Sequence, residues 1–212
     1  MSKILPLNPP KRILMGPGPS DANPVVLRAM AAPLIGHLDP QFIEIMDNVK
    51  VMLREVFQTQ NEFTFAVSAP GSAGMETCFV NLIEPDDEVV ICVNGVFGMR
   101  MCENAERCGA KVIRVEAPWG EPIDPNAVAD ALKSCKPKLV SIVHAETSTG
   151  VLQPLEEISK MTHRADALFL VDAVTSLAGV PLKVDQWGID AIYSGSQKCL
   201  SAPPGLSPIS FS

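Results

Sequence analysis

The sequence contains few aromatic, histidine and basic residues. It has one tyrosine, two tryptophans and three histidines, and aromatic residues make up 5% of its 212 positions. The sequence has 17 Lys and Arg residues against 24 Asp and Glu residues, which gives a formal charge of −7 and a pI near 5.0. Because nucleic acids and anionic membranes attract basic surfaces, neither is an expected partner.

Long apolar runs are also missing. No stretch approaches the roughly 20 residues that a membrane-spanning helix needs, and prolines interrupt the first ten residues before a signal-peptide core could form. We therefore predict a cytoplasmic protein. A peroxisomal or mitochondrial location is the alternative if the source is eukaryotic, since some targeting signals lie at a C-terminus.

Neither the cysteines nor the histidines have the spacing of a metal site. The six cysteines form no CxxC pair and fall mostly in apolar stretches, which is typical of reduced, buried thiols. Cys199 is predicted to pack in the same way, with a reactive thiol as the alternative. His37, His144 and His163 lack metal-ligand spacing, so we expect no metal.

The chain is rich enough in apolar residues, at 47%, to bury a substantial core. Short apolar β-rich runs alternate with amphipathic segments from residue 63 onward, which predicts an α/β fold with a mainly parallel sheet flanked by helices. The expected strands are 63–68, 88–94, 111–116, 138–144, 167–172 and 191–194. We predict an extended N-terminal arm over residues 1–22 and one large domain over residues 23–212.

Helix boundaries have clear local signals. Asn23-Pro24, Asp39-Pro40 and Asp124-Pro125 each place a capping residue before a proline, which predicts three helix starts. Gly109 predicts a helix end. In the second helix, an apolar stripe of period three to four predicts a core-facing surface, with a subunit interface as the functional alternative; its residues are Phe42, Ile45, Met46, Val49, Leu53, Val56 and Phe57.

Residues 205–212 resemble the start of a further strand with no helix after it. From this we expect the chain to stop inside a larger fold. We also expect residues 1–212 alone to expose an unpaired strand edge and apolar surface, and therefore to be poorly soluble and inactive.

The strongest chemical signal is a lysine and a carboxylate in related positions. Lys198 follows Ser194-Gly195-Ser196-Gln197, and Asp172 ends an apolar strand. To hold pyridoxal phosphate (PLP), a protein needs a lysine that forms a Schiff base with the aldehyde and a carboxylate that keeps the pyridine nitrogen protonated. Each residue alone is more typical of a surface lysine or a turn cap, but together they favour a PLP site.

Three further segments could complete such a site. Gly71 and Ser72 lie in a small-residue turn before a predicted helix, whose first N–H groups suit a phosphate monoester. Phe97 could stack on an aromatic ring or simply pack in the core. Thr147 could donate a hydrogen bond to the phenolate oxygen, although such turns are common.

Several motifs, taken in order, resemble the class V aminotransferases of PLP fold type I, in the branch of the alanine–glyoxylate and serine–glyoxylate enzymes. They are Gly16-Pro17-Gly18-Pro19, Gly36-His37-Leu38-Asp39-Pro40, Glu146-Thr147-Ser148-Thr149-Gly150, Val171-Asp172-Ala173-Val174, Ser194-Gly195-Ser196-Gln197-Lys198 and Pro203-Pro204-Gly205. The resemblance implies a PLP-binding large domain, without the C-terminal small domain that carries the family's substrate-carboxylate arginine.

The resemblance also implies roles for individual residues. Lys198 would carry the cofactor and Asp172 would pair with the pyridine nitrogen, with Val174 against the ring and Thr147 at the phenolate oxygen. The phosphate would lie among Gly71, Ser72 and Gln197. Two positions depart from the family pattern. Phe97 stands where relatives often have Trp, and Pro70 stands where some have Ser, which removes one hydroxyl from the phosphate site.

The implied activity is transamination of alanine or serine with glyoxylate or another small oxo acid, in a homodimer. A ureidoglycine–glyoxylate aminotransferase is the alternative within the family, although His37 stands where we associate glutamine with those enzymes. A lyase or desulfurase would need a catalytic cysteine from a region that this sequence does not include. A non-catalytic cofactor-domain homologue, acting as an interaction module, is the alternative from a different class.

Overall fold

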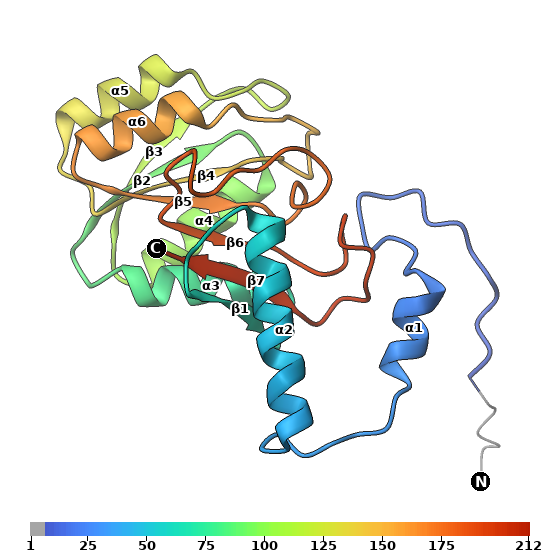
Figure 1. Ribbon diagram of the computed structural model, residues 1–212. Helices are drawn as coiled ribbons and strands as arrows, with labels where there is room; N and C mark the ends of the chain where they lie inside the picture. Colours follow the sequence, from blue (N-terminus) through green and yellow to red (C-terminus); the bar gives the residue numbers. More distant parts are fainter. Residues whose placement is uncertain (1–6) are drawn as a thin grey trace, which may run out of the picture.

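The computed structural model describes residues 7–212, which form a seven-stranded sheet with helices on both faces and an N-terminal segment that extends away from it (Figure 1). The strands lie in the order β1-β7-β6-β5-β4-β2-β3. Five neighbouring strands are parallel, and β7 runs antiparallel to both of its neighbours. The predicted α/β architecture with a mainly parallel sheet is therefore confirmed.

The strands follow the apolar runs of the sequence. Their bounds are β1 Phe63–Val67, β2 Glu88–Val93, β3 Lys111–Glu116, β4 Leu139–Val143, β5 Leu168–Asp172, β6 Ala191–Tyr193 and β7 Ser207–Phe211. Successive side chains of a strand point to opposite faces of the sheet, so a strand covered on both faces is apolar throughout. In β4, all five residues are buried, with Val140 and Ile142 in one core cluster and Leu139 and Val143 in the other.

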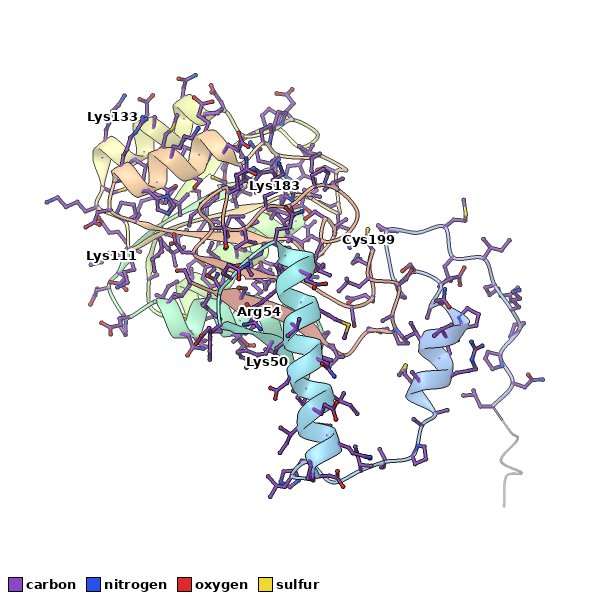
Figure 2. All side chains as sticks on the ribbon, in the orientation of Figure 1. Lys50, Arg54, Lys111, Lys133, Lys183 and Cys199 are labelled. Atoms are coloured by element: carbon purple, nitrogen blue, oxygen red, sulfur yellow. The ribbon has the colours of Figure 1, made fainter. Side chains whose placement is uncertain are left out.

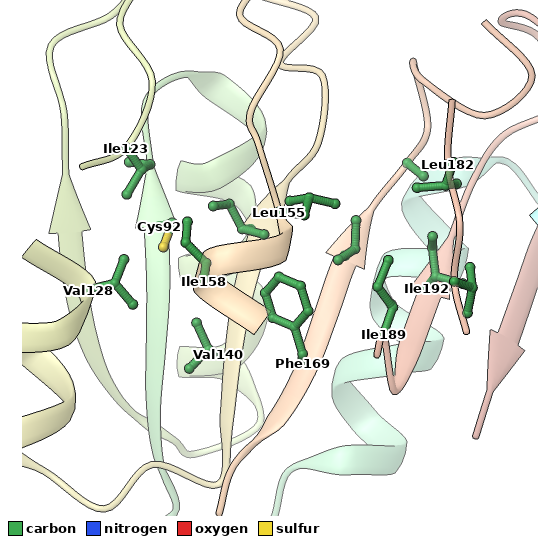
Figure 3. Close-up of a cluster of buried hydrophobic side chains, with 14 of the residues drawn as sticks. Cys92, Ile123, Val128, Val140, Leu155, Ile158, Phe169, Leu182, Ile189 and Ile192 are labelled. Atoms are coloured by element: carbon green, nitrogen blue, oxygen red, sulfur yellow. The ribbon is translucent and has the colours of Figure 1, made fainter. Parts of the chain in front are cut away.

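The helices divide between the two faces. α3 (Gly71–Leu82) and α4 (Val96–Arg107) pack on one face, while α5 (Pro125–Ser134), α6 (Glu156–Arg164) and the end of α2 (Pro40–Phe57) pack on the other. Figure 3 shows the core on the second of these faces, where Val128 of α5 and Ile158 of α6 belong to the same buried cluster as Phe169 of β5. No helix among residues 7–212 is both long and apolar enough to cross a membrane.

The predicted helix boundaries are confirmed. α1 (Pro24–Met30), α2 and α5 begin at the expected prolines, and the side chains of Asn23, Asp39 and Asp124 each accept a hydrogen bond from the backbone N–H two residues on. Gly109 follows the end of α4 with φ of +86°, a conformation that favours glycine.

The expectation that the last strand has an unpaired edge is wrong. β7 exists, but it lies between β1 and β6, so both of its edges are hydrogen-bonded within residues 7–212. Residues 207–210 are buried, and α3 packs against the face that carries Ser207: a Cβ atom at Gly74 would lie 1.9 Å from Ser207 Oγ. The sheet edges are instead formed by β1 and β3. An exposed edge at β7 therefore gives no reason for poor solubility.

The apolar stripe of α2 is only partly directed to the core. Leu53 and Phe57 are buried and Val49 and Val56 pack against them, but Ile45 is 52% exposed. α1 has no buried residue, and α1 and the first turns of α2 lie away from the sheet (Figures 1 and 2). Residues 7–23 form no helix or strand, and the first six residues of the predicted arm lie outside the described part.

Candidate active site

A pocket of about 150 Å³ lies where the carboxyl end of β5 and the loop after β6 meet the first turns of α3 and α4. In open parallel sheets, ligands bind outside the carboxyl ends of the strands, where loops and helix N-termini converge. The residues that line it are Pro70, Gly71, Ser72, Met75, Phe97, Arg100, Asp172, Val174, Gln197 and Lys198.

Seven of the eight predicted site residues share this pocket, although they come from four separate segments of the sequence. Thr147 is the exception. Its Oγ1 is hydrogen-bonded to Thr175 Oγ1, and it is not among the residues that line the pocket. That these eight residues bind PLP stays a prediction, but the structure brings most of them to one place.

Asp172 is a buried carboxylate held by two donors. The backbone N–H of Val174 donates to Oδ1 and the Tyr193 hydroxyl donates to Oδ2, each at 2.8 Å. Burial raises the pKa of Asp172 to about 6, although both hydrogen bonds and the charge of Lys198 act in the opposite direction. The carboxylate is thus oriented from two sides before any ligand binds.

Tyr193 was not predicted as a site residue from the sequence. In the parallel pairing of β5 with β6, Asp172 lies opposite Tyr193, so the two residues end neighbouring strands. The signal was available in principle, because Tyr193 is the only tyrosine of the chain and lies in the predicted strand 191–194. The missing information was that the two strands are adjacent and in this register.

Lys198 is covered by the N-terminal segment. Its Nζ donates to the Pro17 carbonyl oxygen at 2.6 Å, and burial lowers the pKa of Lys198, while the charge of Asp172 opposes this shift. Ser20 ties the same segment down: its N–H donates to the Gln197 carbonyl and its hydroxyl to the Lys198 carbonyl. The Gly16-Pro17-Gly18-Pro19 motif therefore lies directly against the lysine.

The opposite end of the pocket suits an anion. Gly71 and Ser72 begin α3, and the first N–H groups of a helix have no carbonyl partner within it. The side-chain oxygen of Gln197 is buried and has no hydrogen-bond partner within residues 7–212. Since the amide also carries an N–H₂ group, Gln197 can turn a donor toward a phosphate oxygen.

Phe97 and Arg100 form the wall contributed by α4. Phe97 is half-buried, and the guanidinium carbon of Arg100 lies 5.1 Å from the centroid of its ring. Arg100 forms no ion pair in the part of the chain that the structure describes, so it adds positive charge to the pocket. Arg100 was not predicted as a site residue, because an arginine on a helix surface has no distinctive local signal.

The residues fit PLP. Gly71 lets the start of α3 lie close to Val174, since a Cβ atom there would approach Val174 Cγ2 to 3.1 Å. A helix N-terminus and an unpartnered amide suit the phosphate, an aromatic side chain suits one ring face, and a carboxylate and a lysine with a lowered pKa suit the pyridine nitrogen and the aldehyde.

Two remaining sequence predictions concern Cys199 and His144. Cys199 is exposed rather than packed in the core, and its Sγ donates to the Thr175 carbonyl at 3.3 Å. His144 is buried, which lowers its pKa to about 4, and its ring meets that of Trp187 edge-on. Both rings line a larger groove of about 630 Å³, which shares no residue with the pocket and contains none of the predicted site residues.

Comparison with known proteins gives three concordant findings. The sequence model described as "Aminotransferase class-V" matches residues 21–212. Alanine–glyoxylate aminotransferase of Rattus norvegicus is 48% identical over 206 residues, which are 97% of this chain and 50% of that protein. (S)-ureidoglycine–glyoxylate transaminase of Bacillus subtilis (strain 168) is 45% identical over 202 residues, 95% of this chain and 49% of that protein.

The solved structures agree. The crystal structure of alanine–glyoxylate aminotransferase from Nostoc sp. matches with a TM-score of 0.98 at 47% identity, over 100% of this chain and 56% of that one. This match confirms the predicted fold type. The chain spans about half the length of the curated relatives that it matches.

Proposed function

The chain belongs to the class V aminotransferase family, and from this membership we propose that it supplies the cofactor-binding part of an enzyme that transfers an amino group between small molecules. The proposed donor is alanine or serine, and the proposed acceptor is glyoxylate or another small oxo acid. The single observation that supports this most strongly is the pocket that joins Lys198 to Asp172, with Gly71 and Ser72 at its far end.

PLP is the cofactor of this family, and when bound it supplies an electrophilic aldehyde and a ring that withdraws electrons from the substrate. Lys198 is the residue that would carry it. Asp172 would pair with the pyridine nitrogen, and Gly71, Ser72 and Gln197 would hold the phosphate. Phe97 and Val174 would contact the ring.

Lys198 is suited to moving a proton. An amine acts as a base only when it is neutral, and an ordinary lysine is almost fully charged near pH 7. Burial lowers the pKa of Lys198, which increases the neutral fraction. Released from the cofactor, Lys198 Nζ can take a proton from the substrate α-carbon and later return it to another carbon.

Asp172 contributes through charge and orientation. Its two oxygens are fixed by Val174 and Tyr193, so the carboxylate does not have to reorganise when it meets a cationic partner. A protonated ring nitrogen would in turn favour the ionised form of Asp172, whose pKa is raised to about 6, mainly by burial.

We also propose that the enzyme is a homodimer. The N-terminal segment exposes large apolar side chains on α1, on the 31–39 connection and on the first turns of α2, namely Val25, Leu27, Met30, Leu34, Ile35, Leu38, Ile43, Ile45 and Met46. Exposed apolar side chains gathered in one segment favour association, and a second copy of the chain could cover them.

The ureidoglycine–glyoxylate reaction is the second candidate. It is supported by the 45% identity to the B. subtilis enzyme, a value close to those for the alanine–glyoxylate enzymes. Steady-state turnover by the full-length protein with alanine, serine or ureidoglycine as donor, and glyoxylate as acceptor, separates the two. The first proposal predicts a kcat/KM for alanine or serine at least about tenfold above that for ureidoglycine.

The cofactor site has a direct chemical test. Borohydride treatment of the full-length protein with PLP should fix a pyridoxyl group on the peptide that contains Lys198. Lys198→Arg should abolish the label, while Lys183→Arg, a matched change at a lysine outside the pocket, should keep it. A label on another lysine would contradict the site, and a protein that binds PLP without turning over any donor would favour the interaction-module alternative.

A further inference from the structure

We infer that Glu146 is a positioning residue of the cofactor site: it fixes the first turn of α4, and with it Phe97, against the turn that carries Thr147. The inference rests on the proposed function, because it concerns how the pocket presents an aromatic ring to the cofactor. Glu146 does not line the pocket itself and therefore acts through other residues.

The contacts of Glu146 account for both of its oxygens. Oε2 accepts hydrogen bonds from the N–H groups of Phe97 at 3.1 Å and Gly98 at 3.4 Å. Oε1 accepts from the N–H of Ser148 at 3.1 Å and from its hydroxyl at 2.7 Å. The Ser148 hydroxyl accepts in turn from the N–H of Val96 at 3.0 Å.

This arrangement replaces a cap that the local sequence does not provide. The first N–H groups of a helix need acceptors from outside it, and α1, α2 and α5 obtain one from the side chain directly before them. The residue before α4 is Gly95, which has no side chain to offer. Glu146 and Ser148, about 50 positions further along the chain, satisfy Val96, Phe97 and Gly98 instead.

The fit around this carboxylate is tight. Glu146 is 1% exposed, and a Cβ atom at Gly95 would lie 2.4 Å from its Cγ. Glu146 forms no ion pair within residues 7–212, so its charge is stabilised by hydrogen bonds and by the positive end of the helix dipole. Burying a carboxylate among neutral donors is costly unless each oxygen is satisfied, and here each has two donors.

Glu146 positions two parts of the site, the start of α4 with Phe97 and the turn that carries Thr147. Phe97 is held by its own backbone N–H, which points at Oε2, so the start of its side chain is fixed relative to β4. On the other side, Thr147 lies between Glu146 and Ser148, both of which belong to the same hydrogen-bonded group. One buried carboxylate thus links the residue predicted for the ring face to the residue predicted for the phenolate oxygen.

The test uses Glu146→Gln in the full-length protein. Glutamine keeps the shape but has one acceptor oxygen instead of two, and its N–H₂ group must face other donors. Loss of charge-assisted hydrogen bonds should raise the dissociation constant of PLP at least about tenfold and lower the visible circular dichroism of the bound cofactor. Ser148→Ala should change both in the same direction by about threefold.

A matched control separates positioning from general stability. Asp190 is a partly buried carboxylate that also accepts two hydrogen bonds, from the Phe169 N–H and from His163. It lies directly before β6, at the opposite end of that strand from the pocket. Asp190→Asn should lower the free energy of unfolding, as Glu146→Gln does, but should leave the PLP dissociation constant and the circular dichroism within about twofold.

A double-mutant cycle identifies the route of the effect. If Glu146 acts through Phe97, then Glu146→Gln should weaken PLP binding much less when Phe97→Leu is already present, because contacting residues are non-additive. Independent, additive effects of the two substitutions would overturn the inference, as would an unchanged circular dichroism in Glu146→Gln. Failure of the unmodified protein to bind PLP would instead contradict the proposed function, so the two failures are distinguishable.

Discussion

The two ends of α2 lie in opposite environments, although the same apolar stripe runs along the whole helix. At its C-terminal end, Phe57 is fully buried against the sheet, whereas at its N-terminal end Ile45 is 52% exposed. The sheet domain obtains its stability from side chains that already have neighbours within the chain. The N-terminal segment, from residue 7 to the middle of α2, carries apolar side chains whose proposed neighbours belong to a second copy.

Truncating one apolar side chain at each end of α2 should have the largest effect on stability. Phe57→Ala should lower the free energy of unfolding by about 3–5 kcal/mol, at any protein concentration, because it leaves a cavity in the core. Ile45→Ala should lower it only at concentrations where the chain self-associates. Urea denaturation of both variants over a hundredfold range of concentration checks this. An equal, concentration-independent loss for Ile45→Ala would show that the stripe is buried within the chain.

The next largest effect on stability is expected from the buried carboxyl group of Asp172. Burial raises the pKa of Asp172 to about 6 from an unfolded value near 3.8, so between these values the folded protein binds more protons than the unfolded one. The stability of the cofactor-free protein should therefore fall as the pH rises from about 4 to about 6, by about 2–3 kcal/mol for this group.

Asp172→Asn should remove that part of the pH dependence, because the amide does not titrate in this range. The measurement is the difference in unfolding free energy between the two proteins at pH 4.5 and at pH 7. A difference that stays constant between these pH values would contradict the raised pKa.

The contact between the N-terminal segment and the sheet domain can be loosened without changing a residue of the hydrophobic core. At Gly18, a Cβ atom would lie 2.6 Å from Lys198 Cδ, and φ is +130°, so Gly18→Ala should displace the arm from the lysine. The Ser20 N–H, which donates to the Gln197 carbonyl, should then exchange its hydrogen about tenfold faster. Gly16→Ala is the matched control, since a Cβ atom there meets nothing within 4 Å. Equal exchange rates in both variants would show that the arm does not depend on Gly18.

Removal of helix caps should have the smallest effect on the free energy of unfolding, and it should again distinguish the sheet domain from the N-terminal segment. Asp124→Ala removes the cap of α5, which contributes Val128 to the core, and should lower the unfolding free energy by about 1 kcal/mol. Asn23→Ala removes the equivalent cap of α1, which has no buried residue, and should change the same quantity by less than about 0.3 kcal/mol in the monomer. Thermal or chemical unfolding of the pair measures both, and equal losses would mean that α1 unfolds together with the sheet domain.

Features set by local chemistry were predictable from the sequence. The caps at Asn23, Asp39 and Asp124 are such features, because a helix start depends on a few adjacent residues. The parallel strands were also predictable, since burial on both faces leaves an almost continuous apolar run. In the candidate site, Lys198 and Asp172 stood out because their chemistry is rare in combination.

Features set by pairing at long range were not predictable. The insertion of β7 between β1 and β6 depends on backbone partners far away in the chain, and the apolar pattern of 205–212 does not reveal them. For the same reason, the contact of Tyr193 with Asp172 and the contact of Glu146 with the start of α4 could not be predicted. In both cases the fold brings together residues that are far apart in the sequence. The stripe of α2 was ambiguous for a different reason: a periodic pattern shows that a face will be covered, but not whether the cover belongs to the same chain.

The position of β7 also has a consequence for folding during synthesis. Thr64 and Ser210 are in contact across the β1–β7 pair although they are 146 positions apart. During synthesis, β1 therefore cannot pair with β7 until almost all of this region has been made. Contacts between distant residues form slowly, because a long loop must close first. Until then, β1 and β6 each present an unpaired edge, and a nascent chain in that state is prone to aggregation. Completion of the sheet should therefore be a late event of synthesis, at which chaperones that bind exposed strands would have their strongest effect.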